Sequence, residues 1–482
     1  MRKRVISILA TTMMGVSVMS QGEESGLSLD LKGAVEYAIA NNKNLMNARQ
    51  ELVKSDKSVW EAISQGLPQV DAVLDYMTYF NYELQFEFGV TEDFEFTQEM
   101  INDAATRTLS EFPGVTAQDL YNHSAGNYYD GVLQSNMPPA TIQMSDQLTA
   151  KLQVAQLIFS GQYIVGIQTA RLAKIISRQS LENSEANTKE SVVNAYYLVL
   201  ITESSLDMVR QNLDNLELIL GQTKKMYETG MAEAIDVDQF RITVNQLENS
   251  MKSLERNLEL NYNMLRFTLG IPAGTDINLS DDLDGLFEGM EPAGLLLEDF
   301  QKESNITYRI LSSQAEISKK LWKIEEWNFG PTISGFYNYN FKLRTTNFDM
   351  TPNHLAGFAV NMPIFSSGMR AAKTTQARID YEIAERDAEI LGDRLELQNR
   401  QMKYNLQSSL ENYYTQKENV SVARRVLDSY RMKYQQGMAS SMDVTQSNSN
   451  YLEAISSYLQ AIFEVMNAKI QLEKLMNNLS SL

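Results

Sequence analysis

The chain has 482 residues, of which 43% are hydrophobic and 21% are charged, and its formal net charge is −19. This composition excludes a disordered chain and a bundle of membrane-spanning helices. The acidic charge argues against nucleic acid as a partner, because proteins bind the phosphate backbone with an excess of Lys and Arg.

The residue types of common catalytic and metal sites are scarce. There is no cysteine, and His123 and His354 are the only histidines. These counts exclude disulfides and lipid attachment through an N-terminal cysteine, and they argue against a histidine-based triad or zinc site. Asp281, Asp282 and the acids of residues 91–103 lack the spacing of a calcium loop, which favours a solvated acidic surface. We therefore expect no cofactor, no metal site and no enzymatic activity.

The N-terminus is typical of an exported protein. Basic residues at positions 2–4 precede an uncharged apolar run from Val5 to Met19. This pattern predicts a secretory signal peptide over residues 1–20. The apolar run is shorter than the ~20 residues that a spanning helix needs, and no later run reaches that length. If the mature protein enters a membrane, we expect it to do so as strands.

A first structural repeat is predicted over residues 21–270. Residues 29–66 show helical periodicity with a break at 41–44. Strands near 69–88 and 147–158 follow, because apolar and polar residues alternate there. A helix over 163–229 comes next and contains no proline. A tip at 230–235 and a returning helix over 236–269 complete the repeat.

The returning helix carries a heptad seam, since its apolar residues are spaced alternately three and four apart. It is about half as long as the helix before it. Residues 44–66 and 235–269 together hold 58 residues, close to the 67 of the long helix. End-to-end stacking of these two helices would place the strands at one end and the tip ~100 Å away.

A second repeat is predicted over residues 301–482, after a linker at 271–300 that bears Gly, Asp and Pro. Its elements follow the same order as those of the first repeat. They are strands near 332–341 and 355–364, a long helix over 369–436, a tip at 437–442 and a returning helix over 443–479.

The strongest sign of this duplication is a stretch that occurs at 227–239 and again at 434–446, with seven of its thirteen residues identical. Each copy has a glycine that can end one helix and, six residues later, an aspartate that can cap the next. A self-similar stretch between helical segments indicates a repeated helical hairpin.

The predicted strands imply an assembly of several chains. Four strands cannot close a barrel, and an open sheet edge is not tolerated in lipid. Three chains would give twelve strands, an even number in the observed range. The predicted fold class is mainly α with a β-barrel part, in which long helical hairpins form an α-barrel.

In the order and spacing of these features, the chain resembles the TolC family of outer-membrane efflux ducts over essentially its whole mature length. The segments that carry the resemblance, besides both tips, are Ala38-Ile39-Ala40-Asn41-Asn42, Gly66-Leu67-Pro68-Gln69, Phe159-Ser160-Gly161, Leu269-Gly270-Ile271-Pro272 and Phe365-Ser366-Ser367-Gly368. The resemblance implies a homotrimer with strands in the lipid of the outer membrane and helices in the periplasm. It also implies passive conduction, with a periplasmic adaptor and an inner-membrane transporter as partners. We expect the long segment 89–146 to lie on the extracellular side.

The resemblance also assigns residues to the periplasmic aperture. Asp443 falls on the family's aperture acid, and Gln446 stands where a second acid is expected. Asp236 and Tyr434 correspond to a pair that is in contact. Ala439 replaces a basic latch residue, so the closed state must be held differently. For Asp443 two interpretations stay open, a helix N-cap alone or a cap that also joins a ring of acids in the pore.

The family's adaptors dock on the helix tips. Carried over to this chain, the docking residues are Tyr227, Gly230, Met231, Ala232, Gly437, Met438 and Ala439. Tyr227 and Tyr434 are also compatible with simple packing. An exported coiled-coil structural or adhesive protein is the alternative function. It would explain the heptads, but not four alternating strands in a duplicated arrangement.

Overall fold

The computed structural model describes residues 27–80, 82–86, 140–345 and 351–479, with a few single positions between 98 and 119. The predicted signal peptide and most of the segment 89–146 lie outside these residues. The chain folds as two compact units. Unit 1 consists of residues 1–59, 168–322 and 375–482, and unit 2 of residues 60–167 and 323–374.

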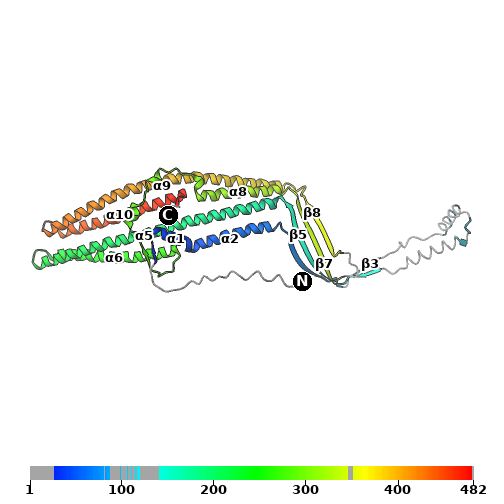
Figure 1. Cartoon of the computed structure of the whole chain (residues 1–482), viewed down its shortest axis with the longest axis horizontal. Helices are drawn as coiled ribbons and strands as arrows, with labels where there is room; N and C mark the ends of the chain where they lie inside the picture. The colour runs from blue at the N-terminus through cyan, green and yellow to red at the C-terminus, as the bar shows by residue number, and fades with distance from the viewer. Residues whose placement is uncertain are drawn as a thin grey trace, which may run out of the picture. The chain divides into compact units, whose positions relative to one another are not determined.

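Unit 2 is built on a four-stranded antiparallel sheet in the order β2-β5-β7-β8 (Figure 1). Its strands are β2 (Gln69–Met77), β5 (Gln147–Ser160), β7 (Thr332–Arg344) and β8 (His354–Asn361). A separate pair is formed by β3 (Glu83–Phe86) and β4 (Ala140–Gln143). The single strand predicted near 69–88 is therefore wrong. The chain breaks after Met77, where Phe80 has a φ of 51° that no strand accommodates.

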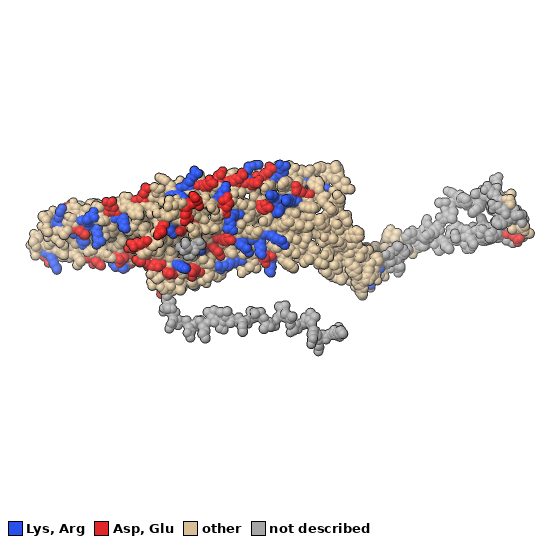
Figure 2. Space-filling view, turned by 45° about the horizontal axis from the view of Figure 1, so that its top comes forward, with Lys and Arg blue, Asp and Glu red and all other residues tan. Residues whose placement is uncertain are grey.

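The sheet has an apolar and a polar face, as its alternating sequence requires. Leu152 of β5 lies between Ala72 and Tyr339, whereas the next residue along β5 lies between Asp71 and Asn338. Side chains alternate across a strand, so these two rows point to opposite sides. Figure 2 shows charges of both signs over the helices and few over the strands.

The two outer strands have uncovered edges. Within the described residues, β2 and β8 each pair with only one strand of the sheet. Both carry exposed apolar side chains, with Leu74 66% exposed and Phe358 76% exposed. A row of unpaired backbone groups beside exposed apolar side chains is a site for strand pairing with another chain.

Unit 1 is helical. Its shorter helices are α1 (Leu31–Asn41), α2 (Lys43–Ser64), α7 (Leu283–Glu288) and α8 (Ile306–Trp327). The longer ones are α5 (Gly161–Glu228), α6 (Ala234–Leu269), α9 (Met369–Gln435) and α10 (Ser441–Met476). The ends of α2, α5, α8 and α9 extend into unit 2. Figure 1 shows α5 and α6 as one hairpin and α9 and α10 as another.

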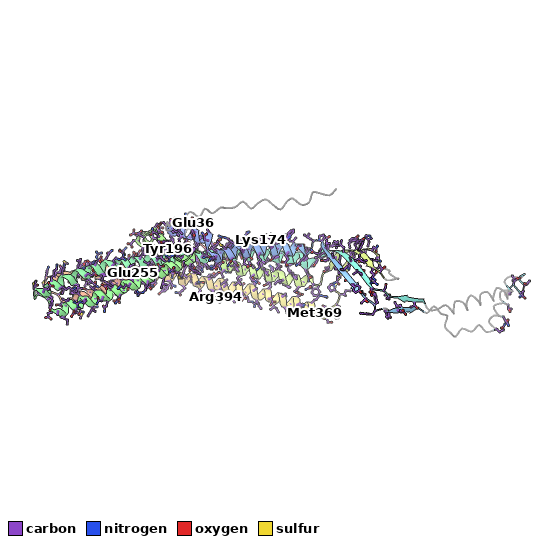
Figure 3. All side chains as sticks on the ribbon, turned by 90° about the horizontal axis from the view of Figure 1, so that it is seen from below. Glu36, Lys174, Tyr196, Glu255, Met369 and Arg394 are labelled. Atoms are coloured by element: carbon purple, nitrogen blue, oxygen red, sulfur yellow. The ribbon has the colours of Figure 1, made fainter. Side chains whose placement is uncertain are left out.

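A buried centre joins the N-terminal segment to the linker. Strand β1 (Leu27–Leu29) pairs in parallel with β6 (Ile277–Leu279). The hydroxyl of Tyr196, labelled in Figure 3, donates to Asp281 Oδ2 at 2.9 Å, and the Leu31 amide donates to the same oxygen at 2.7 Å. Burial and the bond to Asp281 raise the pKa of Tyr196, so the hydroxyl keeps its proton. Asp281 therefore has structural partners, and its expected role as a solvated surface acid is wrong.

A second buried cluster lies near the tips and packs the two hairpins together. Its fully or nearly fully buried members include Leu216 of α5, Phe240 of α6, Tyr434 of α9 and Val444 of α10. Because this cluster draws side chains from all four long helices, it fixes how the hairpins meet. The heptad seam of α6 contributes Val237, Phe240, Val244 and Leu247 to the cluster.

Candidate functional site

Both tips are made by the same helix-ending turn. Gly230 and Gly437 adopt φ values of 74° and 77°, in the left-handed region that suits glycine. The next amide reaches back across the turn in each copy, from Met231 to the Met226 carbonyl and from Met438 to the Lys433 carbonyl, both at 2.8 Å. This is the Schellman arrangement, which satisfies carbonyls that the helix end leaves open.

The returning helices begin two residues earlier than predicted, so Asp236 and Asp443 are not their N-caps. The caps are Glu233 and Ser440, and each aspartate occupies the third helical position. Its carboxylate accepts from the amide of the cap residue, at 3.1 Å for Asp236 and 2.9 Å for Asp443. The pattern is a capping box, in which the third helical residue bonds back to the cap.

The two tips are joined by one short side-chain hydrogen bond. Ser441 Oγ, at the first position of α10, donates to Asp236 Oδ1 of α6 at 2.5 Å. The Asp236 carboxylate is thus shared between its own capping box and the other hairpin. Sequence reasoning missed Ser441, because the corresponding residue of the first copy is Ala234 and the duplicated pattern gives no sign of it.

Tyr434 forms no hydrogen bond with Asp236 among the described residues, although the negative charge of Asp236 lies near enough to help raise the pKa of the tyrosine. Its hydroxyl lies 3.1 Å from Thr223 Oγ1, and its ring packs edge-on against Phe240 with centroids 5.3 Å apart. Burial raises the pKa of Tyr434, which keeps the hydroxyl protonated. Ser441 already occupies one Asp236 oxygen, and Thr223 gives the tyrosine a partner inside the cluster.

Asp443 remains an exposed anion at the start of α10. The amide and hydroxyl of Ser440 donate to its carboxylate and lower its pKa below the ordinary value. Gln446 stands one turn further along α10 and donates to Asn450 Oδ1 at 2.9 Å. Neither side chain is covered in the single chain, so both are available to a pore or to another subunit.

The predicted docking residues divide into two kinds. Met231 and Met438 project from the tips and are 71% and 66% exposed. Tyr227 is also exposed, whereas its counterpart Tyr434 is buried in the cluster. Ala232 and Ala439 are half-buried, and Ala439 packs against the cluster. The two copies therefore share a turn and an exposed methionine, but their tyrosines have different roles.

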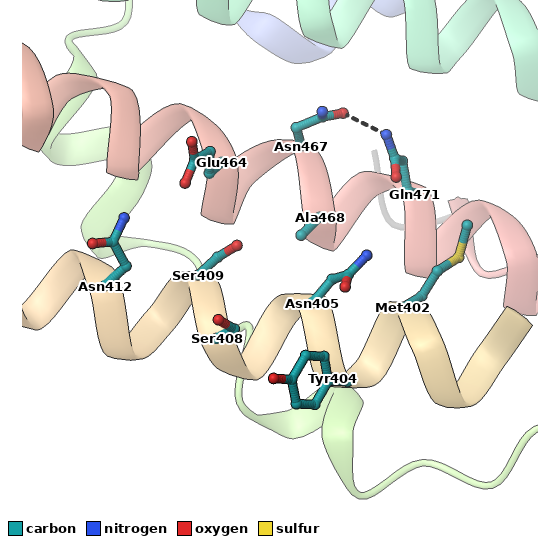
Figure 4. A pocket seen from close by; sticks show the side chains of 10 residues that line it. All are labelled: Met402, Tyr404, Asn405, Ser408, Ser409, Asn412, Glu464, Asn467, Ala468 and Gln471. Atoms are coloured by element: carbon teal, nitrogen blue, oxygen red, sulfur yellow. Dashed lines mark hydrogen bonds between the residues drawn. The ribbon is translucent and has the colours of Figure 1, made fainter.

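A polar cavity of about 400 Å³ lies between α9 and α10 (Figure 4). Its α9 side carries Asn405, Ser409 and Asn412, and its α10 side carries Asn467 and Gln471, which bond to each other at 3.1 Å. Amides and hydroxyls here replace the apolar side chains that close an ordinary coiled-coil seam. Polar side chains of both helices therefore line their seam at this level. The sequence analysis did not single out these residues.

Among the described residues, no helix combines the length and the apolar character that crossing a membrane requires. The described part of the chain also brings together no group of three or more His, Cys, Asp or Glu side chains that suits a metal ion.

Comparison with known sequences places the chain in a family. The model of the outer membrane efflux protein family matches residues 122–271 and 322–478. The outer membrane protein TolC of Vibrio cholerae is 21% identical over 346 residues, which cover 70% of this chain and 78% of that protein. The toluene efflux pump outer membrane protein TtgC of Pseudomonas putida is 26% identical over 220 residues, which cover 43% of each chain.

Solved structures show the same fold. The outer membrane protein VceC of Vibrio cholerae has a TM-score of 0.65 at 15% identity, over 92% of this chain and 95% of that chain. CusC, a protein that forms a transmembrane channel, has a TM-score of 0.69 at 13% identity, over 95% of both chains. The fold is thus mainly helical with a β-barrel part. With a family model that matches more than half of its length, this chain belongs to the TolC-like outer membrane efflux proteins, located in the outer membrane with a periplasmic helical part.

Proposed function

We propose that this protein is the outer-membrane channel of a tripartite efflux or secretion system. It conducts its cargo passively, and a periplasmic adaptor and an inner-membrane transporter deliver that cargo. Three copies of the chain form the channel, each with two structural repeats, residues 21–270 and 301–482, joined by the linker 271–300. The observation that carries this proposal is a pair of uncovered flanks that run from the sheet into the helices.

The first flank contains the edge strand β2 and the helix that leads into it. Along α2 the exposed side chains of Met46, Val53 and Trp60 recur every seven residues. A seven-residue spacing keeps side chains on one face of a helix, as in a coiled coil. The described residues of this chain leave that face open to solvent.

The second flank contains the other edge strand, β8, and the helix that follows it. Here the exposed side chains also recur every seven residues along α9. They are Ile383, Ile390, Leu397 and Tyr404. The two flanks are alike in kind, each an open strand edge continued by an apolar helical stripe. This match supports pairing of the first flank of one subunit with the second flank of the next.

A heterologous contact of this kind closes into a ring when the rotation per subunit divides a full turn. Each chain supplies the four strands of its main sheet, so three chains supply twelve. Closure removes every strand edge, which lipid requires. The apolar face of the sheet then meets the membrane, and its polar face lines the pore.

At the other end of the hairpins, we assign the tips to the entrance. The exposed carboxylates of Asp443 would form a ring that favours cations. Met231 and Met438 present flexible apolar side chains to the adaptor. The bond between Asp236 and Ser441 holds the two hairpins of a subunit together in the closed state.

Paired cysteines test the closure, and the chain has no cysteine of its own to interfere. Val73→Cys on the pore face of β2 is combined in turn with Leu355→Cys, Gly357→Cys or Ala359→Cys on the same face of β8. We expect one combination to give disulfide-linked species of two and three chains and no more, while the single variants give none. Absence of cross-links in all combinations, or a ladder beyond three chains, would refute the proposed trimer.

A further inference from the structure

A buried asparagine joins α6 to α2, although the two helices are far apart in sequence. Asn42 Nδ2 donates to the carbonyl of Thr268 in the last turn of α6, at 2.8 Å. Its Oδ1 accepts from the amide of Asn44 in the first turn of α2, at 2.9 Å. The side chain is 8% exposed, so it is removed from water. One amide group therefore connects the end of one helix with the start of the other.

The second half of the chain contains the same joint. Asn305 Nδ2 donates to the carbonyl of Leu475 in the last turn of α10, at 2.9 Å, and its Oδ1 accepts from the Tyr308 amide of α8 at 3.2 Å. Asn305 is 6% exposed. Thr268 and Leu475 are 207 residues apart, the separation of the doubled tip.

Asparagine suits this position because it offers a donor and an acceptor on one short side chain. The end of a helix leaves carbonyls unpaired, and the start of a helix leaves amides unpaired. Each joint pairs one group of each kind. An aspartate here would still accept from the amide, but it would place a second oxygen against the carbonyl.

We propose that Asn42 and Asn305 are positioning residues for the gate, and that the returning helices turn about these two joints when the tips separate. This inference rests on the proposed function. Helices α5 and α9 continue without a break from Gly161 to Glu228 and from Met369 to Gln435. The returning arms are broken at the joints, where no backbone connects the two helices. A change of angle is therefore absorbed at the joints.

The length of α10 amplifies a small rotation at its joint. With 36 residues the helix is about 54 Å long, so a turn of a few degrees displaces its first residues by several ångströms. Among those first residues, Ser441 donates to Asp236 of the other tip, and Asp443 lies at the proposed entrance.

The two joints are not equally tight. At the first, Gly270 follows α6 with a φ of 78°, and a Cβ on it would lie 2.7 Å from the Asn41 carbonyl oxygen. At the second, Asn477 takes the equivalent left-handed conformation, with a φ of 58°. A cavity of about 250 Å³ lies beside it, lined by Glu298, Asp299, Gln301, Ser304, Met476, Asn477 and Asn478. We therefore expect changes at Asn305 to have the larger effect.

The test compares Asn305→Asp and Asn42→Asp with Asn478→Asp in reconstituted full-length protein. The first two keep the cap acceptor and remove the donor. Asn478→Asp adds the same charge beside the second joint, where the exposed Asn478 side chain lines the cavity. We expect the open probability to rise about two- to tenfold in Asn305→Asp, the factor of one lost hydrogen bond, less in Asn42→Asp, and not at all in Asn478→Asp.

Asp236→Asn, measured in the same bilayers, distinguishes failure of the proposed pivots from failure of the proposed function. If Asp236→Asn opens the channel while both joint variants behave as wild type, the joints are not pivots and the proposed function stands. If no variant and no wild-type sample conducts, the proposed function fails and the inference with it. Should Asn305→Asp not assemble, Asn42→Asp decides, and an unchanged open probability there overturns the inference.

Discussion

At the scale of single residues, the hydrogen bond between Ser441 and Asp236 would, in the proposed channel, take the place of the basic latch residue that the resemblance leads one to expect at Ala439. A hydrogen bond from a hydroxyl to a carboxylate is stronger than one between two neutral groups, but it is not a salt bridge. In the proposed channel, a short polar bond over a buried apolar cluster would hold the closed state. Forming such a contact does not require the desolvation of two opposite charges.

Removal of the hydroxyl should loosen the gate. We expect Ser441→Ala to raise the conductance of the reconstituted channel about two- to tenfold, since one hydrogen bond of the closed state is lost. Single-channel recording in planar bilayers measures this effect. Ser449→Ala is the control, because that exposed hydroxyl only donates to the Thr445 carbonyl of its own helix. Equal conductance of the two variants would argue against the latch.

Asp443 should set ion selectivity. Asp443→Asn retains an oxygen for the Ser440 amide, so we expect little change in stability. Loss of three carboxylates at the entrance should lower the preference for cations, read from the reversal potential in a salt gradient. Asp443→Ala should also lose the bonds of the capping box and some stability with them. An unchanged reversal potential in both variants contradicts the aperture assignment.

The pH dependence follows from the hydrogen bonds of Asp443. Ser440 lowers the pKa of this carboxyl, so the ionised form is favoured in the folded protein. The stabilisation is present above the unfolded pKa of about 3.9 and is lost as the pH falls through the lower folded value. We expect cation preference to persist unchanged from pH 7 to pH 5 and to fall only below pH ~4, measured by reversal potential. A midpoint near pH 6 would be inconsistent with this account.

The tip glycines and their left-handed turns could be predicted from the sequence, because a duplicated glycine between two helices has few other uses. The partner of Tyr434 could not. Thr223 lies 211 residues away, and only the packing of both hairpins brings the two hydroxyls together. The spacing of Ser440 and Asp443 is that of a capping box. The sequence prediction nevertheless placed the aspartate at the N-cap, whereas it is the third residue of the helix.

At the scale of elements, apolar periodicity located the helices, and their exact starts depended on cap chemistry. The strand predicted near 69–88 failed because its residues stay strand-like in composition beyond Met77, where the backbone turns. The joints at Asn42 and Asn305 could not be predicted from the sequence either. End-to-end stacking of α2 on α6 was expected from lengths, but the side chains that bind the ends are single asparagines.

The stripe on α2 should be needed for assembly and not for folding of the chain. Val53 is exposed in the single chain, so Val53→Glu should leave the monomer intact. In the trimer the charge would be buried without a partner, and we expect the trimer to dissociate into monomers. Size-exclusion chromatography with light scattering measures the mass. Ser58→Glu, an exposed position on the opposite face of α2, should remain trimeric, and a trimeric Val53→Glu would mean that this face is not an interface.

At the scale of the whole molecule, the two compact units differ in structure and in proposed role. The sheet of unit 2 has an apolar face, which we assign to lipid, and a polar face, which we assign to the pore, and the hairpins of unit 1 carry the tips. The family could be inferred from the order of helices, strands and tips, since that order is repeated. The proposed closure into a trimer would depend on flanks that belong to different subunits, and one chain displays them only as exposed edges and stripes.

The most direct test of a channel gated at its tips is the conductance of the purified protein in a planar bilayer, for the wild type and for Asp236→Asn combined with Ser441→Ala. The account predicts a small, cation-preferring conductance for the wild type and a severalfold larger one for the double variant. A wild type and a double variant that both fail to conduct, or that conduct equally, would contradict it.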